Sequence, residues 1–275
     1  MITRPIPGSG QEIPVIGMGS HITFNVGNDP QARLQRTDVL RTFFEMGGQL
    51  IDSSPMYGSS EEVLGYCIGQ LGREAAPLFS ATKVWTRGKE AGQEEISASH
   101  KLWGVERFNL NQVHNLVDWP TQLATLLQIK EEGRLQYVGI TTSHGRRHRE
   151  LGEIMRTQPI DFVQLSYHID NLAAEQSLLP LAQERGIAVI VNRPFMKGRL
   201  FDLYQHHALP AWASEFDCEN WAQFFLKFAV SHPAVTCAIP ATSRVDHMRE
   251  NMGACYGRLP TPQQRNRMLA YVQSL

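Results

Sequence analysis

Four polar side chains of complementary chemistry follow three consecutive apolar segments of this sequence. Asp52 ends the first segment, and Tyr57 stands on the loop after it. Lys83 follows the second segment and His114 the third. A free phenol has a pKa of about 10; a nearby ammonium lowers that value, and a carboxylate keeps the ammonium charged. A neutral imidazole can orient a carbonyl oxygen or relay a proton, so the set predicts a general acid aimed at a carbonyl.

These residues need elements that bring them together, and the sequence alternates between strand-like and helix-like segments. The expected strands are apolar on both faces, which is typical of parallel strands covered on both sides. They are Val15–Met18, Leu50–Asp52, Leu78–Thr82, Leu110–Val113, Gln136–Ile140, Phe162–Leu165, Ala188–Val191 and Thr236–Ile239. The clearest helix patterns cover Thr37–Gly47, Thr121–Gly133 and Leu178–Gly186, and each ends in a glycine suited to a helix C-terminus.

Eight strand–helix units in 275 residues predict the α/β class and a (β/α)8 TIM barrel, formed by one domain over residues 1–275. Barrel enzymes carry their chemistry at the C-terminal ends of the strands, where the four side chains fall. A doubly wound sheet is the alternative, but Gly17-Met18-Gly19-Ser20 lacks the third glycine of its phosphate-binding turn. Residues Met1–Pro14 are expected to form a short N-terminal hairpin that plugs the lower mouth of the barrel.

Composition argues against several other classes of protein. The 26 basic and 27 acidic side chains give a formal charge of −1, which argues against a nucleic-acid partner or a polybasic membrane protein. No apolar run approaches the ~20 residues that span a membrane, and the N-terminus lacks an apolar signal region. We therefore expect a cytoplasmic protein, although an exported form with a trimmed leader would have the same sequence. No coiled-coil pattern requires assembly, so we expect a monomer.

Two groups of side chains that could bind metals have simpler interpretations. The four cysteines form no CxxC pair, and we expect them to be reduced and mostly buried. His206 and His207 fall in residues Phe201–Ser214, which we expect to form a long loop. Because no third ligand accompanies these histidines, we interpret them as solvated and predict no metal site.

A substrate pocket is expected at the mouth that carries the four polar side chains, with a small-molecule carbonyl compound as the partner. Its candidates, all on loops after strand ends, are His21, Phe24, Met56, Trp85, Asn115 and His168. His21 could meet a polar or acidic substrate or simply face solvent, and the sequence leaves both open. Trp103 and Trp221 sit in helical patterns and are expected to pack in the core.

The four side chains match a known pattern in order and local context. In the aldo-keto reductases, an Asp is followed five residues on by a Tyr, then by a Lys and a His on the next two strands. The sequence resembles this family nearly end to end, and residues 114–119 (HNLVDW) resemble a bacterial branch closely. The resemblance implies NADPH-dependent reduction of an aldehyde or ketone to an alcohol without a metal. Hydride would pass from the nicotinamide to the carbonyl carbon, and Tyr57 would give its proton to the oxygen.

The resemblance also implies cofactor-binding residues, with departures near the nicotinamide. Gln164 matches the glutamine that bonds the carboxamide, but the family's Ser-Asn pair is Thr141-Thr142 here. Asn192 replaces the tyrosine that stacks on the nicotinamide, and Arg193 could pair with the pyrophosphate or form a structural pair at the rim. The implied residues in this part are Gly19, Ser20, Asp52, Thr141, Thr142, Gln164, Asn192, Arg193, Pro194 and Phe195.

The end of the sequence resembles the family's adenosine-binding segment. The implied residues are Ile239, Thr242, Arg244, His247, Glu250 and Asn251, of which the last two match adenine contacts. Thr242 and Arg244 are candidates for the 2′-phosphate, helped by the helix N-terminus that follows. Ala241 and His247 replace basic residues that some members use, so NADPH is the expected cofactor and NADH the less favoured one.

Three functions compete on these residues. The first is an NADPH-dependent carbonyl reductase. The second is a lyase that uses Lys83 as a Schiff-base nucleophile, which requires a desolvated and uncharged lysine. The third is a non-catalytic NADPH-binding sensor or partner module, which the departures at Thr142 and Asn192 keep open.

Overall fold

The computed structural model describes residues 1–275 and confirms the (β/α)8 barrel. Eight parallel strands pair in the order of the sequence. They are β3 (Met18–Gly19), β4 (Leu50–Asp52), β5 (Phe79–Val84), β6 (Phe108–Val113), β7 (Leu135–Thr141), β8 (Phe162–Ser166), β9 (Ala188–Asn192) and β10 (Cys237–Ala238). Ile16 forms a parallel bridge with Ala238, and the Gly17 amide donates to the Ala238 carbonyl at 2.9 Å. This pairing closes the ring, so the alternative of an open doubly wound sheet is wrong.

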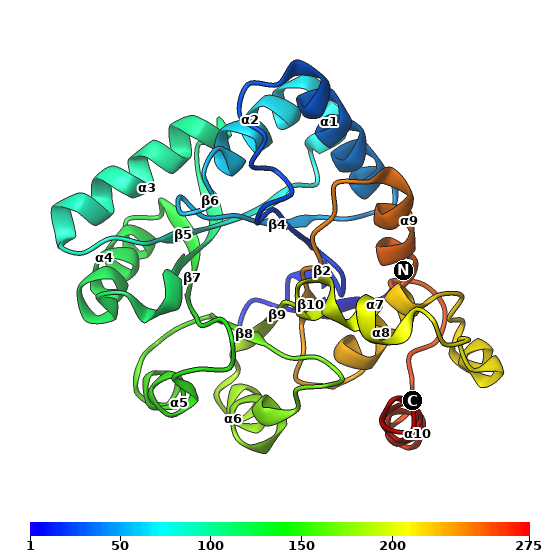
Figure 1. The fold of residues 1–275 in the computed structure, drawn as a ribbon. Helices are drawn as coiled ribbons and strands as arrows, with labels where there is room; N and C mark the ends of the chain where they lie inside the picture. The colour runs from blue at the N-terminus through cyan, green and yellow to red at the C-terminus, as the bar shows by residue number, and fades with distance from the viewer.

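The helices lie outside the strands, and Figure 1 shows α1 to α6 arranged around the barrel. Their bounds are α1 (Pro30–Glu45), α2 (Ser60–Leu71), α3 (Lys89–Trp103), α4 (Trp119–Glu131), α5 (His148–Thr157), α6 (Leu178–Arg185), α7 (Arg199–Tyr204), α8 (Trp221–Val230), α9 (Val245–Gly253) and α10 (Pro262–Gln273). Helix α1 begins two turns before the apolar pattern that predicted it. The Asp29 carboxylate caps this helix by accepting from the Gln31 and Ala32 amides at 2.9 and 3.0 Å.

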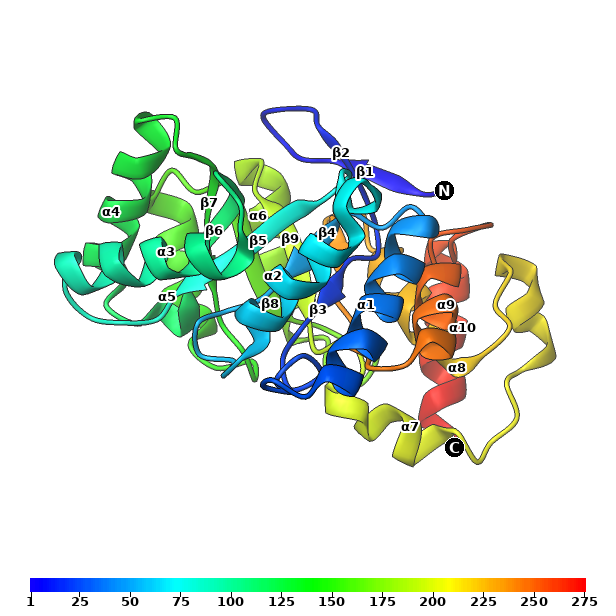
Figure 2. The ribbon, with the colours of Figure 1, turned by 90° about the horizontal axis from the view of Figure 1, so that it is seen from above.

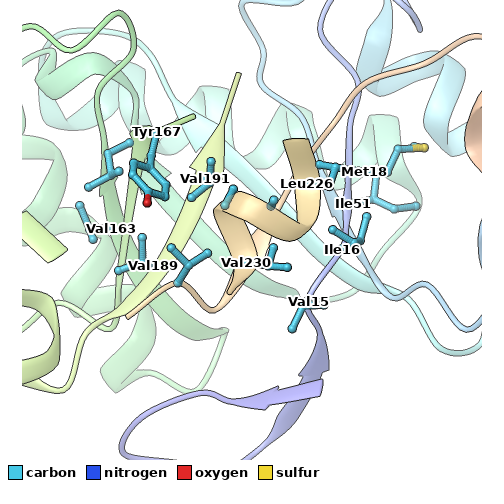
Figure 3. Packing of buried hydrophobic residues seen from close by; sticks show 14 of the residues in the cluster. Val15, Ile16, Met18, Ile51, Val163, Tyr167, Val189, Val191, Leu226 and Val230 are labelled. Atoms are coloured by element: carbon cyan, nitrogen blue, oxygen red, sulfur yellow. The ribbon is translucent and has the colours of Figure 1, made fainter. Parts of the chain in front are cut away.

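Most of the core lies between the strands and the helices. One cluster of 64 buried residues fills this space. Helix α8 is buried along its whole length, and Figure 3 shows Leu226 and Val230 of α8 between Val189 and Val191 of β9 and the segment around Ile16. Trp103 and Trp221 belong to this cluster, which confirms their assignment to packing. All four cysteines are buried and unpaired, as expected.

The N-terminal hairpin closes one end of the barrel, as the sequence predicted. Strands β1 (Thr3–Pro5) and β2 (Glu12–Pro14) pair antiparallel. Ile6 and Ile13 are fully buried in a second cluster of 12 residues, which lies inside the barrel. Figure 2 places the hairpin and helix α7 at opposite ends of the barrel, so the mouth at the strand C-termini lies away from this plug.

The expectation of a long irregular loop over Phe201–Ser214 is wrong in part. The segment holds the end of helix α7 and most of a 3-10 helix over Ala211–Phe216. The aromatic ring of Phe201 packs on Phe195, with ring centroids 4.8 Å apart, so this segment is held by a tertiary contact that the local sequence does not show. His206 and His207 are exposed, which agrees with their interpretation as solvated residues.

Candidate active site

Asp52 lies at the centre of a buried polar layer inside the barrel. Lys83 Nζ is 2.5 Å from Asp52 Oδ2, while the Gln112 and Gln164 amides donate to Asp52 Oδ1 at 3.1 and 2.9 Å. The four side chains come from four strands, and all are at least 98% buried. A buried carboxylate is tolerated when an ion pair and hydrogen bonds satisfy it, and here three donors do so.

Strand periodicity explains why these side chains meet. Leu50 and Phe162 belong to the apolar cluster inside the barrel. Because side chains alternate between the two faces of a strand, Asp52 and Gln164, two residues further on, also point inward. The interior is therefore apolar near the hairpin and polar near the strand C-termini. Asp52 and Gln164 were predicted from the sequence as site residues. Gln112 was not, although its position on β6 follows the same alternation.

Lys83 is held charged between the barrel interior and the phenol ring. Its Nζ donates to the Ser53 carbonyl at 2.7 Å and lies 5.2 Å from the centroid of the Tyr57 ring. Burial by itself lowers the pKa of Lys83, but the charge of Asp52 and the Tyr57 phenol outweigh it, and the pKa is raised. Lys83 is therefore an ammonium at neutral pH.

Tyr57 remains a protonated phenol at neutral pH. From the sequence we expected the charge of Lys83 to bring the pKa of Tyr57 below its ordinary value, and the structure corrects this net direction. Burial raises the pKa of Tyr57, and this effect is larger than the opposing effect of the Lys83 charge. The lysine therefore limits the rise without reversing it. A protonated phenol beside a fixed cation is suited to giving a proton away and to stabilising the phenolate that results.

Two neutral histidines flank the phenol ring. The ring centroid of Tyr57 is 4.8 Å from that of His21 and 5.7 Å from that of His114. Burial, the charge of Lys83 and His21 lower the pKa of His114 to about 2. Burial and the charges of Lys197 and Arg193 lower the pKa of His21. Both imidazoles are therefore uncharged above their lowered pKa values and can make neutral hydrogen bonds at the mouth.

The loop that carries Tyr57 is anchored immediately after it. Ser60 Oγ donates to the Ser20 carbonyl at 3.0 Å. Glu61 is 1% exposed, has no cationic partner, and accepts hydrogen bonds from three buried side chains. The donors are Thr82 Oγ1 at 2.5 Å, Ser99 Oγ at 2.9 Å and Trp103 Nε1 at 3.0 Å. Since Thr82 precedes Lys83 on β5, Glu61 connects the loop of Tyr57 to the strand of Lys83.

A cavity of about 410 Å³ opens beside Tyr57 and His114. It contains three of the six expected pocket residues, namely His21, Met56 and Asn115. Ten of the expected cofactor-binding residues also line it: Gly19, Ser20, Asp52, Thr141, Gln164, Asn192, Arg193, Pro194, Phe195 and Ile239. The structure thus brings together residues from seven different strand ends.

Other expected residues lie outside this cavity. Phe24 is fully buried in the core and His168 is 5% exposed, because the turns after their strands direct both side chains into the protein. Trp85 is 44% exposed, and its ring lies 6.4 Å from that of His114. Thr142 is buried, and its Oγ1 has no hydrogen-bond partner.

Apart from Ile239, the expected adenosine-binding residues also lie outside the cavity, on helix α9 and the turn before it. They are Thr242, Arg244, His247, Glu250 and Asn251. Thr242 Oγ1 accepts from the Arg244 amide at 3.1 Å. Arg244 is exposed and pairs with Asp246, which also accepts from the His247 amide at 3.0 Å. Asn251 is 3% exposed, so its side chain belongs to the inner face of the helix.

Several residues that line the cavity were not predicted from the sequence. They are Ile22, Thr23, Ser143, His144, Lys197, Gly198, Phe201, Pro240 and Ala241. Arg193 and Lys197 share one loop, both have left-handed backbone angles (φ 53° and 60°), and neither forms an ion pair. The four-residue spacing of these two cations after a strand end was the available signal for Lys197.

The structure contains neither a metal-binding cluster nor a membrane-spanning helix. No group of three or more His, Cys, Asp or Glu side chains is arranged to hold a metal ion. No helix is both long enough and apolar enough to cross a bilayer. The closed parallel barrel, with its polar layer at one mouth, has the architecture of an aldo-keto reductase.

Comparisons with known proteins agree with this architecture. The model of the Aldo/keto reductase family matches residues 15–268. Methylglyoxal reductase YeaE of Escherichia coli (strain K12) is 25% identical over 244 residues, covering 87% of this chain and 84% of that protein. The NADH-specific methylglyoxal reductase of the same organism is 26% identical over 248 residues, covering 76% and 73%.

Solved structures show the same fold. An aldo/keto reductase from Klebsiella pneumoniae, solved in complex with NADP and acetate, has a TM-score of 0.83 at 23% identity and covers 99% of this chain and 96% of its own. The holo form of the aldo-keto reductase AKR11C1 from Bacillus halodurans has a TM-score of 0.81 at 20% identity, covering 99% and 96%. The chain belongs to the Aldo/keto reductase family and is an oxidoreductase.

Proposed function

We propose that this protein reduces aldehydes or ketones to alcohols with NADPH, and that Tyr57 donates the proton. The observation that carries the proposal is the buried Lys83–Asp52 pair directly below the Tyr57 ring. This pair places a fixed positive charge where a phenolate would form. A structural ion pair would not require a half-buried phenol and a neutral His114 at the same cavity.

The residues present fit a nicotinamide dinucleotide. Arg193 and Lys197 are cations without carboxylate partners in the cavity wall, which suits the phosphates of such a ligand. Gln164 uses one amide hydrogen on Asp52 and keeps the other for a carboxamide. Thr142 does not line the cavity, but it follows the lining residue Thr141, and its buried Oγ1 still needs a hydrogen bond. The side chains of Thr141 and Asn192 would complete the contacts around the nicotinamide.

The proposed mechanism divides the reaction between the cofactor and the chain. When bound, the nicotinamide supplies the hydride that reaches the carbonyl carbon. Tyr57 gives its phenolic proton to the carbonyl oxygen, and Lys83 stabilises the phenolate left behind. Asp52 keeps Lys83 charged and fixed, while His114 orients the oxygen. Solvent returns the proton to Tyr57 after the alcohol leaves.

The Schiff-base alternative loses support from the geometry. Lys83 is 1% exposed and does not line the cavity, and its pKa is raised. A nucleophilic amine needs to be accessible and uncharged, which is the opposite arrangement. The carbonyl reductase is therefore the function that this site favours.

NADPH is proposed in preference to NADH on the strength of Arg244 at the start of helix α9. An arginine near a helix N-terminus suits the 2′-phosphate that distinguishes the two cofactors. The pairing of Arg244 with Asp246 reduces its charge toward a ligand, and one relative is named NADH-specific. Both cofactors therefore belong in the test.

The decisive experiment measures oxidation of NADPH and of NADH with a panel of aldehydes, ketones and quinones. We expect turnover with several carbonyl compounds and faster turnover with NADPH. Tyr57→Phe is expected to bind NADPH nearly as well as the wild type and to lose about 10²–10⁴-fold in kcat, the usual contribution of a general acid. Unchanged kcat in Tyr57→Phe would remove Tyr57 from the mechanism. Cofactor binding without turnover on any compound would favour the non-catalytic sensor instead.

A further inference from the structure

A serine without an assigned role touches His114 from inside the protein. Ser54 lies two residues beyond Asp52 and is fully buried. Its Oγ is 2.8 Å from His114 Nδ1, and both side chains are buried at this contact. The Met56 amide donates to the same oxygen at 3.3 Å. Ser54 therefore sits behind the imidazole, on the side away from the cavity.

The hydroxyl group can satisfy its bonds in only one way. A serine hydroxyl has one hydrogen to donate and two lone pairs that accept. The Met56 amide occupies one lone pair, and His114 Nδ1 is the single acceptor within reach of the hydrogen. A buried O–H group without an acceptor is costly, so Ser54 donates to His114 Nδ1. This nitrogen must then carry no proton.

Because the His114 ring is neutral, its contact with Ser54 determines which of the two tautomers the ring adopts. Burial and the nearby Lys83 charge lower the pKa of His114 to about 2, so the ring is neutral and carries one proton. With Nδ1 occupied as an acceptor, that proton sits on Nε2. Nδ1 faces Ser54 while the ring lines the cavity beside Tyr57, so Nε2 is the nitrogen available to a bound molecule.

We propose that Ser54 is a positioning residue that holds His114 in the Nε2–H tautomer, so that His114 donates a hydrogen bond to the substrate oxygen. The proposal rests on the proposed carbonyl reduction. It also settles an alternative that the sequence left open, because a ring already protonated at Nε2 cannot take up a proton there. His114 therefore orients and polarises the oxygen, and the proton comes from Tyr57.

The opposite tautomer would have the opposite effect. With the proton on Nδ1, His114 would donate to Ser54 Oγ and leave the Ser54 hydrogen without an acceptor. Nε2 would then present a lone pair to the cavity. A lone pair repels a carbonyl oxygen and competes with it for the Tyr57 proton, so substrates would bind less well in the reactive orientation.

The test combines kinetics with a spectrum that reports the tautomer. Nitrogen NMR of protein that carries ¹⁵N-labelled histidine distinguishes a protonated ring nitrogen from an unprotonated one. The signals that disappear in the variant His114→Asn are those of His114. In the wild type we expect Nε2 protonated and Nδ1 unprotonated. Ser54→Ala is expected to give a mixture of tautomers and about tenfold lower kcat, the worth of one neutral hydrogen bond. Cofactor affinity should not change.

Two further variants separate positioning from general damage. Ser54→Thr restores the hydroxyl and is expected to recover both the wild-type spectrum and kcat. Ser99→Ala removes a buried hydroxyl of similar bond length, 2.9 Å to Glu61, and is expected to leave the His114 spectrum unchanged. Thermal unfolding checks that each variant is folded.

The outcomes distinguish this inference from the proposed function. If the protein reduces carbonyl compounds but has His114 protonated at Nδ1, the role of Ser54 is overturned and the proposed function is not. A Ser54→Ala variant with unchanged kcat and an unchanged tautomer has the same consequence. A protein that reduces no carbonyl compound overturns the proposed function and the catalytic part of the inference. The spectrum needs no turnover, so the tautomer is decided in either case.

Discussion

Replacing Lys83 with methionine tests the central ion pair. The substitution keeps a long apolar side chain but leaves the Asp52 carboxylate buried without its cation. Losing one partner of a buried pair costs about 3–5 kcal/mol of unfolding free energy. Gln112 and Gln164 still donate to Asp52 in the variant, so we expect the lower end, about 3 kcal/mol. In a protein of this size that corresponds to a fall in Tm of roughly 6–12 °C.

A double-mutant cycle isolates the interaction between the two charges. Asp52→Asn removes the charge of the carboxylate and leaves Lys83 buried without its counter-ion. In the double variant Lys83→Met/Asp52→Asn no uncompensated charge remains. We therefore expect its loss of stability to be smaller than the sum of the two single losses by at least about 1 kcal/mol. Urea unfolding measures all four free energies. Strictly additive losses would refute the reasoning, because they would show that the two groups do not stabilise each other.

The loss of stability in Lys83→Met should depend on pH in one direction. The folded-state pKa of Lys83 is raised above its ordinary value of 10.5, although burial alone would lower it. A base with a raised pKa stabilises the fold fully below the ordinary value, and this stabilisation is lost as the pH rises through the folded value. The stability difference between the wild type and Lys83→Met should therefore be constant near neutral pH and shrink above pH 10.5. A difference that grows with pH would contradict this assignment.

Two further predictions concern the cofactor and the buried acid. Arg244→Ala should weaken the binding of NADPH about tenfold more than that of NADH, and Asp246→Asn should strengthen the binding of NADPH alone because it frees Arg244. Fluorescence titrations measure both affinities. Equal losses for the two cofactors in Arg244→Ala would show that Arg244 does not contact the 2′-phosphate. Burial raises the pKa of Glu61, and this effect outweighs the three hydrogen bonds that lower it. Ionisation of Glu61 therefore opposes folding as the pH rises. Glu61→Gln should therefore gain stability relative to the wild type as the pH rises above the ordinary value of 4.5. Urea unfolding measures this difference, and a relative loss with rising pH would contradict the raised pKa.

Much of the fold could be read from local patterns. Short apolar strands, amphipathic helices and terminal glycines are local features, and they predicted the barrel and its hairpin plug. The start of α1 at Pro30 was missed because its first turns are polar and its cap, Asp29, satisfies amides that no apolar pattern marks. The segment after Phe201 was missed for a related reason, since its helical turns are stabilised by tertiary aromatic contacts.

The sequence by itself determined the identities and the order of the chemical groups at the mouth. Parallel strands of a barrel end at one rim, so Asp52, Lys83 and His114 had to converge once the strands were recognised. Tertiary structure alone decided which protonation state each group has. Burial, which no local pattern measures, raises the pKa of Tyr57 against the charge of Lys83, and one contact from Ser54 assigns the proton of His114. These effects depend on groups brought together from distant parts of the chain, and so they exist only in the folded protein.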